Sequence, residues 1–229
     1  MLFRTSYGED LQIVVAPDPR LLKKAELVGI EELPKMKALA TEMAELMYET
    51  MGCGLAATQV GILKRLIVVD PDWGILDEES GEPSPPDPHF LINPVILRLW
   101  GTKELMDEGC LSVPGITVPI ERYESIEVEA FDLDGNMQVF EADGFAARVL
   151  QHEIDHLEGM TLFERLDPLL RIEAIQLYED ALAAGAKPGD TTAPGQESTR
   201  KRVPEQAATP IEEAVSTVSS AVAPPVTVP

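Results

Sequence analysis

Two of the three histidines in this 229-residue chain, His152 and His156, stand four positions apart in the stretch LQHEIDHLEG. If the stretch is helical, this spacing brings both imidazoles to one face, where they can reach one ion. Glu153 lies about 100° further round such a helix, which keeps it out of the ligand set but close enough to take a proton from a water on the ion. This HExxH arrangement is typical of zinc hydrolases.

The third ligand would decide which kind of hydrolase this is, because a catalytic metal site usually has three protein ligands. A third histidine in the pattern HExxHxxGxxH is excluded, since Leu162 occupies its position. Glu173 on a following helix would give the ligand set of thermolysin-like proteases. Cys110, in the stretch DEGCLSVPG, would instead supply a thiolate, which is a good ligand for zinc or ferrous iron. Both alternatives stay open at this point.

The histidine pair is predicted to lie on a helix over residues 144–158, which Asp143 can cap and Gly159 can close. Phe145 and Val149 precede the histidines on the same face, at three- and four-residue spacing. We therefore expect this face of the helix to point inward.

Other elements must surround that helix. A stripe of Met and Leu side chains predicts a helix over 30–50, and Asp167-Pro168 is typical of the start of another. Strand-like runs lie between them: RLIVVD, HFLINPVILRLW and SIEVEAFDLDGNMQVFEA, the last with a hairpin turn at Asp134-Gly135. The pattern predicts an α+β fold, with antiparallel or mixed sheets packed around the central helix that bears HExxH.

Two segments differ from the rest in composition. Residues 72–88 are rich in proline and acidic side chains, which favours a surface loop over a strand. Residues 186–229 are rich in Pro, Ala and Thr and contain no aromatic side chain, so we expect a disordered tail. The catalytic domain is accordingly predicted to span residues 1–185.

Charge and cysteine content exclude several partners. The chain has 18 basic and 40 acidic residues, a net charge of −22, which disfavours nucleic acids and anionic membrane surfaces. The N-terminus has no secretory signal pattern, and no run approaches the ~20 apolar residues of a membrane helix, so a soluble, cytoplasmic protein is expected. Cys53 and Cys110 are the only cysteines, too few for a disulfide framework, and a reducing compartment leaves both thiols free for chemistry.

Three motifs occur in order along the chain: GCGLAATQVG at 52–61, EGCLS at 108–112 and QHEIDHLEG at 151–159. The chain resembles the peptide deformylase family, whose pattern is G-x-G-x-A-A-x-Q, E-G-C-x-S and Q-H-E-x-D-H. Every fixed position of that pattern is present. The resemblance covers residues 11–166 and leaves out the following helix and the tail.

The resemblance implies one divalent metal ion held by Cys110, His152 and His156. The ion would be ferrous iron in the cell, with zinc, nickel or cobalt able to replace it. The implied reaction is hydrolysis of the N-formyl group from the initiator methionine of nascent polypeptides near the ribosome exit, with Glu153 moving the proton. The side-chain amide of Gln59 and the backbone N–H of Leu111 would stabilise the oxyanion.

Further roles follow for the residues around these ligands. Gly54 would let the backbone approach the substrate, and Phe145 and Val149 would form an apolar slot for the methionine side chain. Gln151 is expected to orient Cys110, and Asp155 either to orient a histidine or to form a salt bridge at the surface. Two other functions remain open: an endopeptidase that uses Glu173, and a non-catalytic metal-binding or ribosome-interacting module.

Overall fold

The computed structural model describes residues 11–76 and 81–192 of the chain, with helices and strands in alternation. The α-helices are α1 (Leu33–Glu49), α2 (Gly144–Leu157), α3 (Leu162–Arg165) and α4 (Pro168–Ala183), and short 3-10 turns cover Pro19–Leu22, Ile30–Glu32 and Ala57–Val60. The strands are β1 (Gly54–Ala56), β2 (Leu66–Val69), β3 (His89–Cys110), β4 (Val113–Phe131) and β5 (Met137–Asp143).

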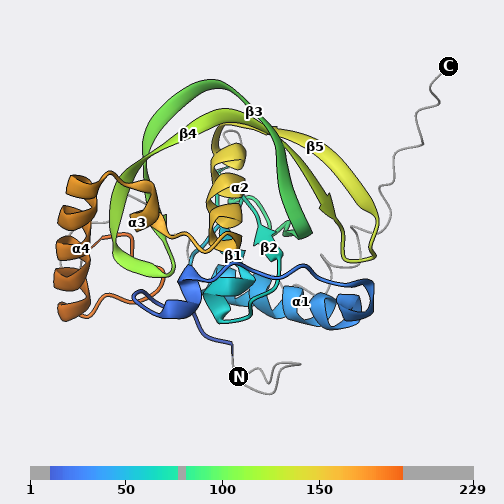
Figure 1. Ribbon diagram of the computed structural model, residues 1–229, viewed down its shortest axis with the longest axis horizontal. Coiled ribbons are helices and arrows are strands. Elements are labelled where there is room, and N and C mark those ends of the chain that lie inside the picture. The colour runs from blue at the N-terminus through green and yellow to red at the C-terminus, as the bar shows by residue number, and fades with distance from the viewer. Residues whose placement is uncertain (1–10, 77–80, 193–229) are drawn as a thin grey trace.

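Within the described residues these strands form one sheet in the order β1-β2-β3-β4-β5, and each neighbouring pair is antiparallel. The long β3–β4 hairpin arches over α2 (Figure 1). In the same view α1 lies below α2, and α4 lies at the left of the domain. The expected α+β class with an antiparallel sheet is confirmed. The sheet curves around the helix that carries the histidine pair, so both imidazoles lie inside the domain.

Three groups of buried side chains fix this arrangement. The face of α2 that carries Ala147, Leu150 and Ile154 packs against β-strand residues such as Ile126 and Val128. The Met and Leu stripe of α1 is buried, with Leu46 only partly so, as expected for a core, and it packs on the opposite side of β2. Helix α4 and β4 enclose a third group that includes Cys110, Leu162 and Tyr178.

Several element boundaries differ from their predicted positions. The expected strand 89–100 continues to Cys110, because β3 pairs with β4 over this whole length. The sequence did not predict the extension, since residues 101–107 are all exposed and carry no alternating pattern of apolar and polar residues. Asp143 does precede α2, but its side chain makes no capping hydrogen bond. Asp167 does cap α4, since its carboxylate accepts from the backbone N–H groups of Leu169 and Leu170.

The two segments of unusual composition behave differently. The described part of 72–88 is largely exposed. The Asp70 carboxylate accepts the Asp87 backbone N–H at 2.8 Å, which brings the two ends of the segment together, and it also accepts from the hydroxyl of Tyr48 on α1 at 2.6 Å. Residues 186–192 contact the domain, so contact continues beyond the expected boundary at 185. The rest of the predicted tail, 193–229, lies outside the described residues. No helix in the described ranges is long and apolar enough to cross a bilayer.

Candidate metal centre

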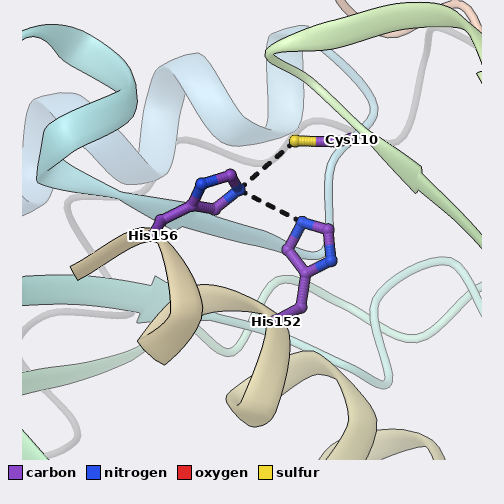
Figure 2. Close-up of side chains that lie close together, drawn as sticks. All are labelled: Cys110, His152 and His156. Atoms are coloured by element: carbon purple, nitrogen blue, oxygen red, sulfur yellow. Dashed lines mark hydrogen bonds between the residues drawn. The ribbon is translucent and has the colours of Figure 1, made fainter. Parts of the chain in front are cut away.

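Cys110, His152 and His156 converge on one point inside the domain (Figure 2). The Nε2 atom of His156 lies 3.3 Å from the Cys110 Sγ and 3.3 Å from the Nε2 of His152. All three ligand atoms lie within 4.8 Å of one another. Tetrahedral coordination at ordinary metal–sulfur and metal–nitrogen lengths places ligand atoms roughly 3.3–3.6 Å apart. The donor set and its spacing therefore fit a single divalent cation.

The local structure explains how the cysteine reaches the helix. Cys110 is the last residue of β3 and pairs with Val113 of β4 across the turn Leu111-Ser112. Because this hairpin end is buried next to α2, the thiol is brought to the two histidines, which follow one another along that helix. Cys110 therefore stands where a strand passes into a turn.

Gln59 presents its amide nitrogen to the same point. Its Oε1 accepts the backbone N–H of Ala56 at 2.7 Å, which directs Nε2 to the Cys110 Sγ at 3.6 Å. The side chain is 1% exposed, so water does not compete for these groups. A buried amide oriented by one partner is a preorganised hydrogen-bond donor for an anionic group beside the thiol.

Glu153 is buried beside the ligands with one oxygen uncommitted. The side chain is 3% exposed, and Oε2 has no hydrogen-bond partner among the described residues. Burial raises the pKa of Glu153 to about 7. A carboxyl group of this kind exchanges a proton readily near neutral pH, as a general base or acid must.

Gly54 makes room for that carboxyl group. A Cβ at position 54 would lie 2.4 Å from the Glu153 Oε1 and 2.9 Å from its Cγ. This close approach to Glu153 is a second reason for a glycine here, and the expected approach of the Gly54 backbone to the substrate stays a prediction. The glycine therefore serves the position of the carboxylate.

Glu108 is the centre of a buried ionic network beside the histidines. Its Oε2 lies 3.0 Å from the Nδ1 of His152, and its two oxygens accept from Arg122 at 2.9 Å each. Arg148 donates to Oε1 at 2.7 Å. Burial by itself would raise the pKa of Glu108, but the hydrogen bonds from His152 and Arg122 outweigh it and hold the pKa far below its usual range.

The two histidines experience opposite environments. Burial lowers the pKa of His152, but the adjacent Cys110 and Glu108 outweigh burial and raise it well above the ordinary value. Burial and the neighbouring His152 lower the pKa of His156 well below that value. Glu108 thus fixes the orientation of the His152 ring through Nδ1, which leaves Nε2 directed at the ligand cluster.

The role expected for Gln151 is wrong, and of the two alternatives for Asp155 the structure has the salt bridge, which is buried and not at the surface. Gln151 binds the backbone of Tyr123, accepting its N–H at 3.3 Å and donating to its carbonyl at 2.9 Å. Asp155 pairs with Arg122 at 2.5 Å and with Arg165. Glu108 takes the orienting role at His152 that was one of the alternatives for Asp155.

A cavity of about 480 Å³ opens onto this cluster, within the ~300–1,000 Å³ typical of small-ligand sites. Gln59, Cys110, Leu111, His152 and Glu153 line it. So do Gly54, Phe145 and Val149, together with 189–192. The helix face with Phe145 does not point wholly inward as expected: Val149 is buried, but Phe145 is 46% exposed at the cavity wall.

The alternative ligand Glu173 lies elsewhere. It is on an exposed face of α4, and the group of potential ligands found in the described ranges consists of Cys110, His152 and His156. The ligand set of thermolysin-like proteases is therefore contradicted. The network of Glu108, Arg122 and Arg148 was missed from the sequence, although Glu108 stands in the EGCLS motif.

Comparison with known proteins agrees with this geometry. The sequence profile described as polypeptide deformylase matches residues 10–171. A peptide deformylase of Desulforudis audaxviator is 42% identical over 154 residues, which is 67% of this chain and 92% of that protein. The crystal structure of a Synechococcus elongatus peptide deformylase with actinonin has a TM-score of 0.61 at 40% identity, covering 72% of this chain and 86% of that one. A Legionella pneumophila peptide deformylase structure has a TM-score of 0.65 at 33% identity, covering 76% and 95%.

Proposed function

Because this chain belongs to the polypeptide deformylase family, we propose that Cys110, His152 and His156 hold the metal ion with which it hydrolyses N-formyl groups. The enzyme is a hydrolase that removes the formyl group from the N-terminal methionine of nascent polypeptides and releases formate. The observation that carries the assignment of residues is the convergence of one thiol and two imidazoles beside a buried carboxyl group with a free oxygen.

The donor set agrees with the family's dependence on a metal. One thiolate and two imidazoles suit ferrous iron or zinc, and we assign iron(II) in the cell, with zinc, nickel or cobalt as substitutes. A divalent cation bound there would polarise the formyl carbonyl and make the attacking water more acidic. Glu108 would stabilise the ligand set through the Nδ1 of His152.

The chain's own residues account for the proton transfers. Glu153 accepts the proton of the attacking water at its uncommitted Oε2 as the new C–O bond forms. It then gives the proton to the methionine nitrogen as the C–N bond breaks, so that formate and a free amine leave. Burial keeps bulk water from competing for this proton.

The oxyanion of the tetrahedral state requires hydrogen-bond donors. Gln59 Nε2 is already directed at the Cys110 sulfur by the Ala56 contact, and we assign the backbone N–H of Leu111 as a second donor. One such donor typically contributes ~3 kcal/mol to lowering the barrier. Phe145 and Val149 at the cavity wall are assigned to the methionine side chain, and the site of action to the cytoplasm, on chains near the ribosome exit.

Anaerobically prepared protein is expected to release formate from a formyl-Met peptide, with one free amine per formate.

The cobalt-substituted protein should show the intense near-ultraviolet band of a sulfur–cobalt bond, because Cys110 is the only cysteine in the ligand cluster of the described chain. Cys110→Ala should lose the band, whereas Cys53→Ala should keep it. If the wild-type protein binds metal but releases no formate, the proposed function is wrong. If the band is unchanged in Cys110→Ala, Cys110 is not a ligand of the metal.

Gly54→Ala is expected to lower kcat by about 100-fold, because misplacing a catalytic group by ~1 Å can have an effect of this size. The new methyl group would meet Oε1 and Cγ of Glu153, whose burial leaves little room to move. Gly29→Ala is a matched control: its Cβ would approach the Glu31 Oε1 at the same 2.4 Å, but Glu31 is exposed and can turn away. Equal kcat values for the two variants would contradict the role given to Gly54.

A further inference from the structure

Residues Ala186–Thr192, called the strap below, follow α4 and lie against the cavity of the metal centre. We propose that the strap binds the part of the substrate that follows the formylated methionine and that, together with Asp107, it disfavours acidic residues there. This inference rests on the proposed function. The strap lies outside the matched residues 10–171, so it is a feature of this chain beyond the family match.

The first half of the strap is packed tightly against β4. A Cβ on Gly115 would lie 2.7 Å from the Cβ of Ala186 and 2.8 Å from that of Ala181. The backbone N–H of Gly115 also donates to the Asp190 carbonyl at 2.7 Å. Gly115 therefore allows two backbone segments to approach more closely than any other residue would, and the strap is held by main-chain contacts.

The second half bridges to the end of α1. The Asp190 carboxylate accepts the Lys187 N–H at 2.8 Å and closes a turn, in which Gly189 has a φ of +96°. A Cβ on Gly189 would lie 2.6 Å from the Thr50 carbonyl oxygen. The Thr191 methyl group lies 3.7 Å from where a Cβ of Gly109 would stand, one residue before the ligand Cys110.

The strap is thus one wall of the cavity in which the reaction takes place. Gly189, Asp190, Thr191 and Thr192 line the same space as Cys110 and Glu153. The formyl group must lie at the ligand cluster, so the substrate chain leaves the cavity past the outer walls. The strap offers backbone groups and the side chain of Thr192 there, which suit hydrogen bonding to a peptide in an extended conformation.

The charges around the cavity favour a cationic substrate residue. Arg148 and Glu108 line it but neutralise each other at 2.7 Å, and Glu153 belongs to the reaction. Asp107, which is exposed, and Asp190, which is half-buried and whose carboxylate also accepts the Lys187 N–H, are the other acidic residues that line the space. Like charges across an interface are disfavoured, so an acidic residue after the methionine is expected to bind less well than a basic one.

The test compares kcat/KM of the metal-loaded, full-length enzyme for formyl-Met amide and for formyl-Met peptides that continue with Lys, Ala or Glu. Wild type should prefer Lys over Glu by about fivefold or more at low salt, and less at high salt. Asp107→Asn should reduce this preference by at least about twofold, with little change for the Ala peptide.

Displacing the strap should affect the longer substrates only. Gly189→Ala is expected to lower kcat/KM about fivefold for all three peptides, the equivalent of one lost hydrogen bond, and to leave formyl-Met amide unchanged. Gly185→Ala is the matched control, because Gly185 also has a positive φ, +91°, but a Cβ there would meet nothing within 4 Å.

Failure of the inference and failure of the proposed function give different results. If wild type releases no formate from any substrate, the proposed function fails and the inference fails with it. If wild type is active but Gly189→Ala leaves the ratio of peptide to formyl-Met amide activity unchanged, and Asp107→Asn leaves the ratio of Lys to Glu peptide activity unchanged, the function stands and the strap has no part in substrate binding. If Gly189→Ala lowers activity on formyl-Met amide as much as on the peptides, the strap is only structural.

Discussion

Glu153→Gln is expected to lower kcat for formate release by about 10²- to 10⁴-fold, the usual contribution of a positioned general acid or base. Glutamine fills the same buried space beside Gly54 but cannot accept the proton of the attacking water. KM should change little, because the carboxylate acts on the water and the leaving nitrogen and does not line the outer cavity.

Measurements of bound metal distinguish the loss of proton transfer from the loss of the metal site. Metal content and the sulfur–cobalt band should be unchanged in Glu153→Gln, since the ligand cluster is formed by Cys110, His152 and His156. Glu158→Gln provides a matched control on the same helix, because Glu158 pairs with Lys24 and Arg65 away from the cavity. Retention of more than a tenth of wild-type kcat by Glu153→Gln would show that another group moves the proton.

Glu108→Gln is expected to destabilise the fold by ~3–5 kcal/mol, because it leaves the buried guanidinium group of Arg148 without its counter-charge and that of Arg122 with Asp155 alone. For a domain of this size that corresponds to a fall in Tm of about 10 °C. The same change weakens the contact to His152 Nδ1, so metal affinity should fall by ~10- to 100-fold.

Calorimetry of the metal-free and metal-loaded proteins, with a metal-binding titration, measures both effects. Glu141→Gln is the control, since Glu141 pairs with Arg98 at 3.0 Å on the surface and both side chains are more than half exposed. Its Tm and metal affinity should match wild type. A Glu108→Gln protein with wild-type Tm would mean that the buried network contributes nothing to stability.

The sequence could predict features whose cause lies within a few residues. The HExxH spacing needs only one helix, so α2 and the shared face of its histidines followed directly. The Met stripe of α1 and the Asp167 cap of α4 are local patterns as well, and both are confirmed. Cys110 could not be placed by such reasoning, because it is 42 positions from His152, and Glu173 remained an open alternative until motifs were compared.

The features that the sequence could not predict depend on contacts between residues of different strands and helices. Glu108 meets Arg122 because β3 and β4 pair in a particular register, and no spacing in the sequence reveals that register. For the same reason the side chains of Gln151 and Asp155 could not be assigned: both stand next to a ligand in sequence, but the helix turns them to Tyr123 and to Arg122. The strap was assigned to the tail because its composition is that of the tail, whereas its contacts depend on Gly115 and Gly189.

The exposed ribbon of β3 has a consequence for how this protein opens. Residues 101–107 are all exposed and belong to none of the three buried groups, and only the Glu104 carbonyl among them accepts from the buried Arg148, whereas Glu108 and Cys110 on the same strand are buried in charge pairs and apolar packing. Local unfolding follows such differences in burial, so the outer ribbon can separate and close again while the inner end stays intact. The part of the domain that unfolds as one unit is then expected to end inside β3, between Asp107 and Glu108. The buried end of the β3–β4 hairpin, which carries Cys110, is expected to open only when the whole domain unfolds.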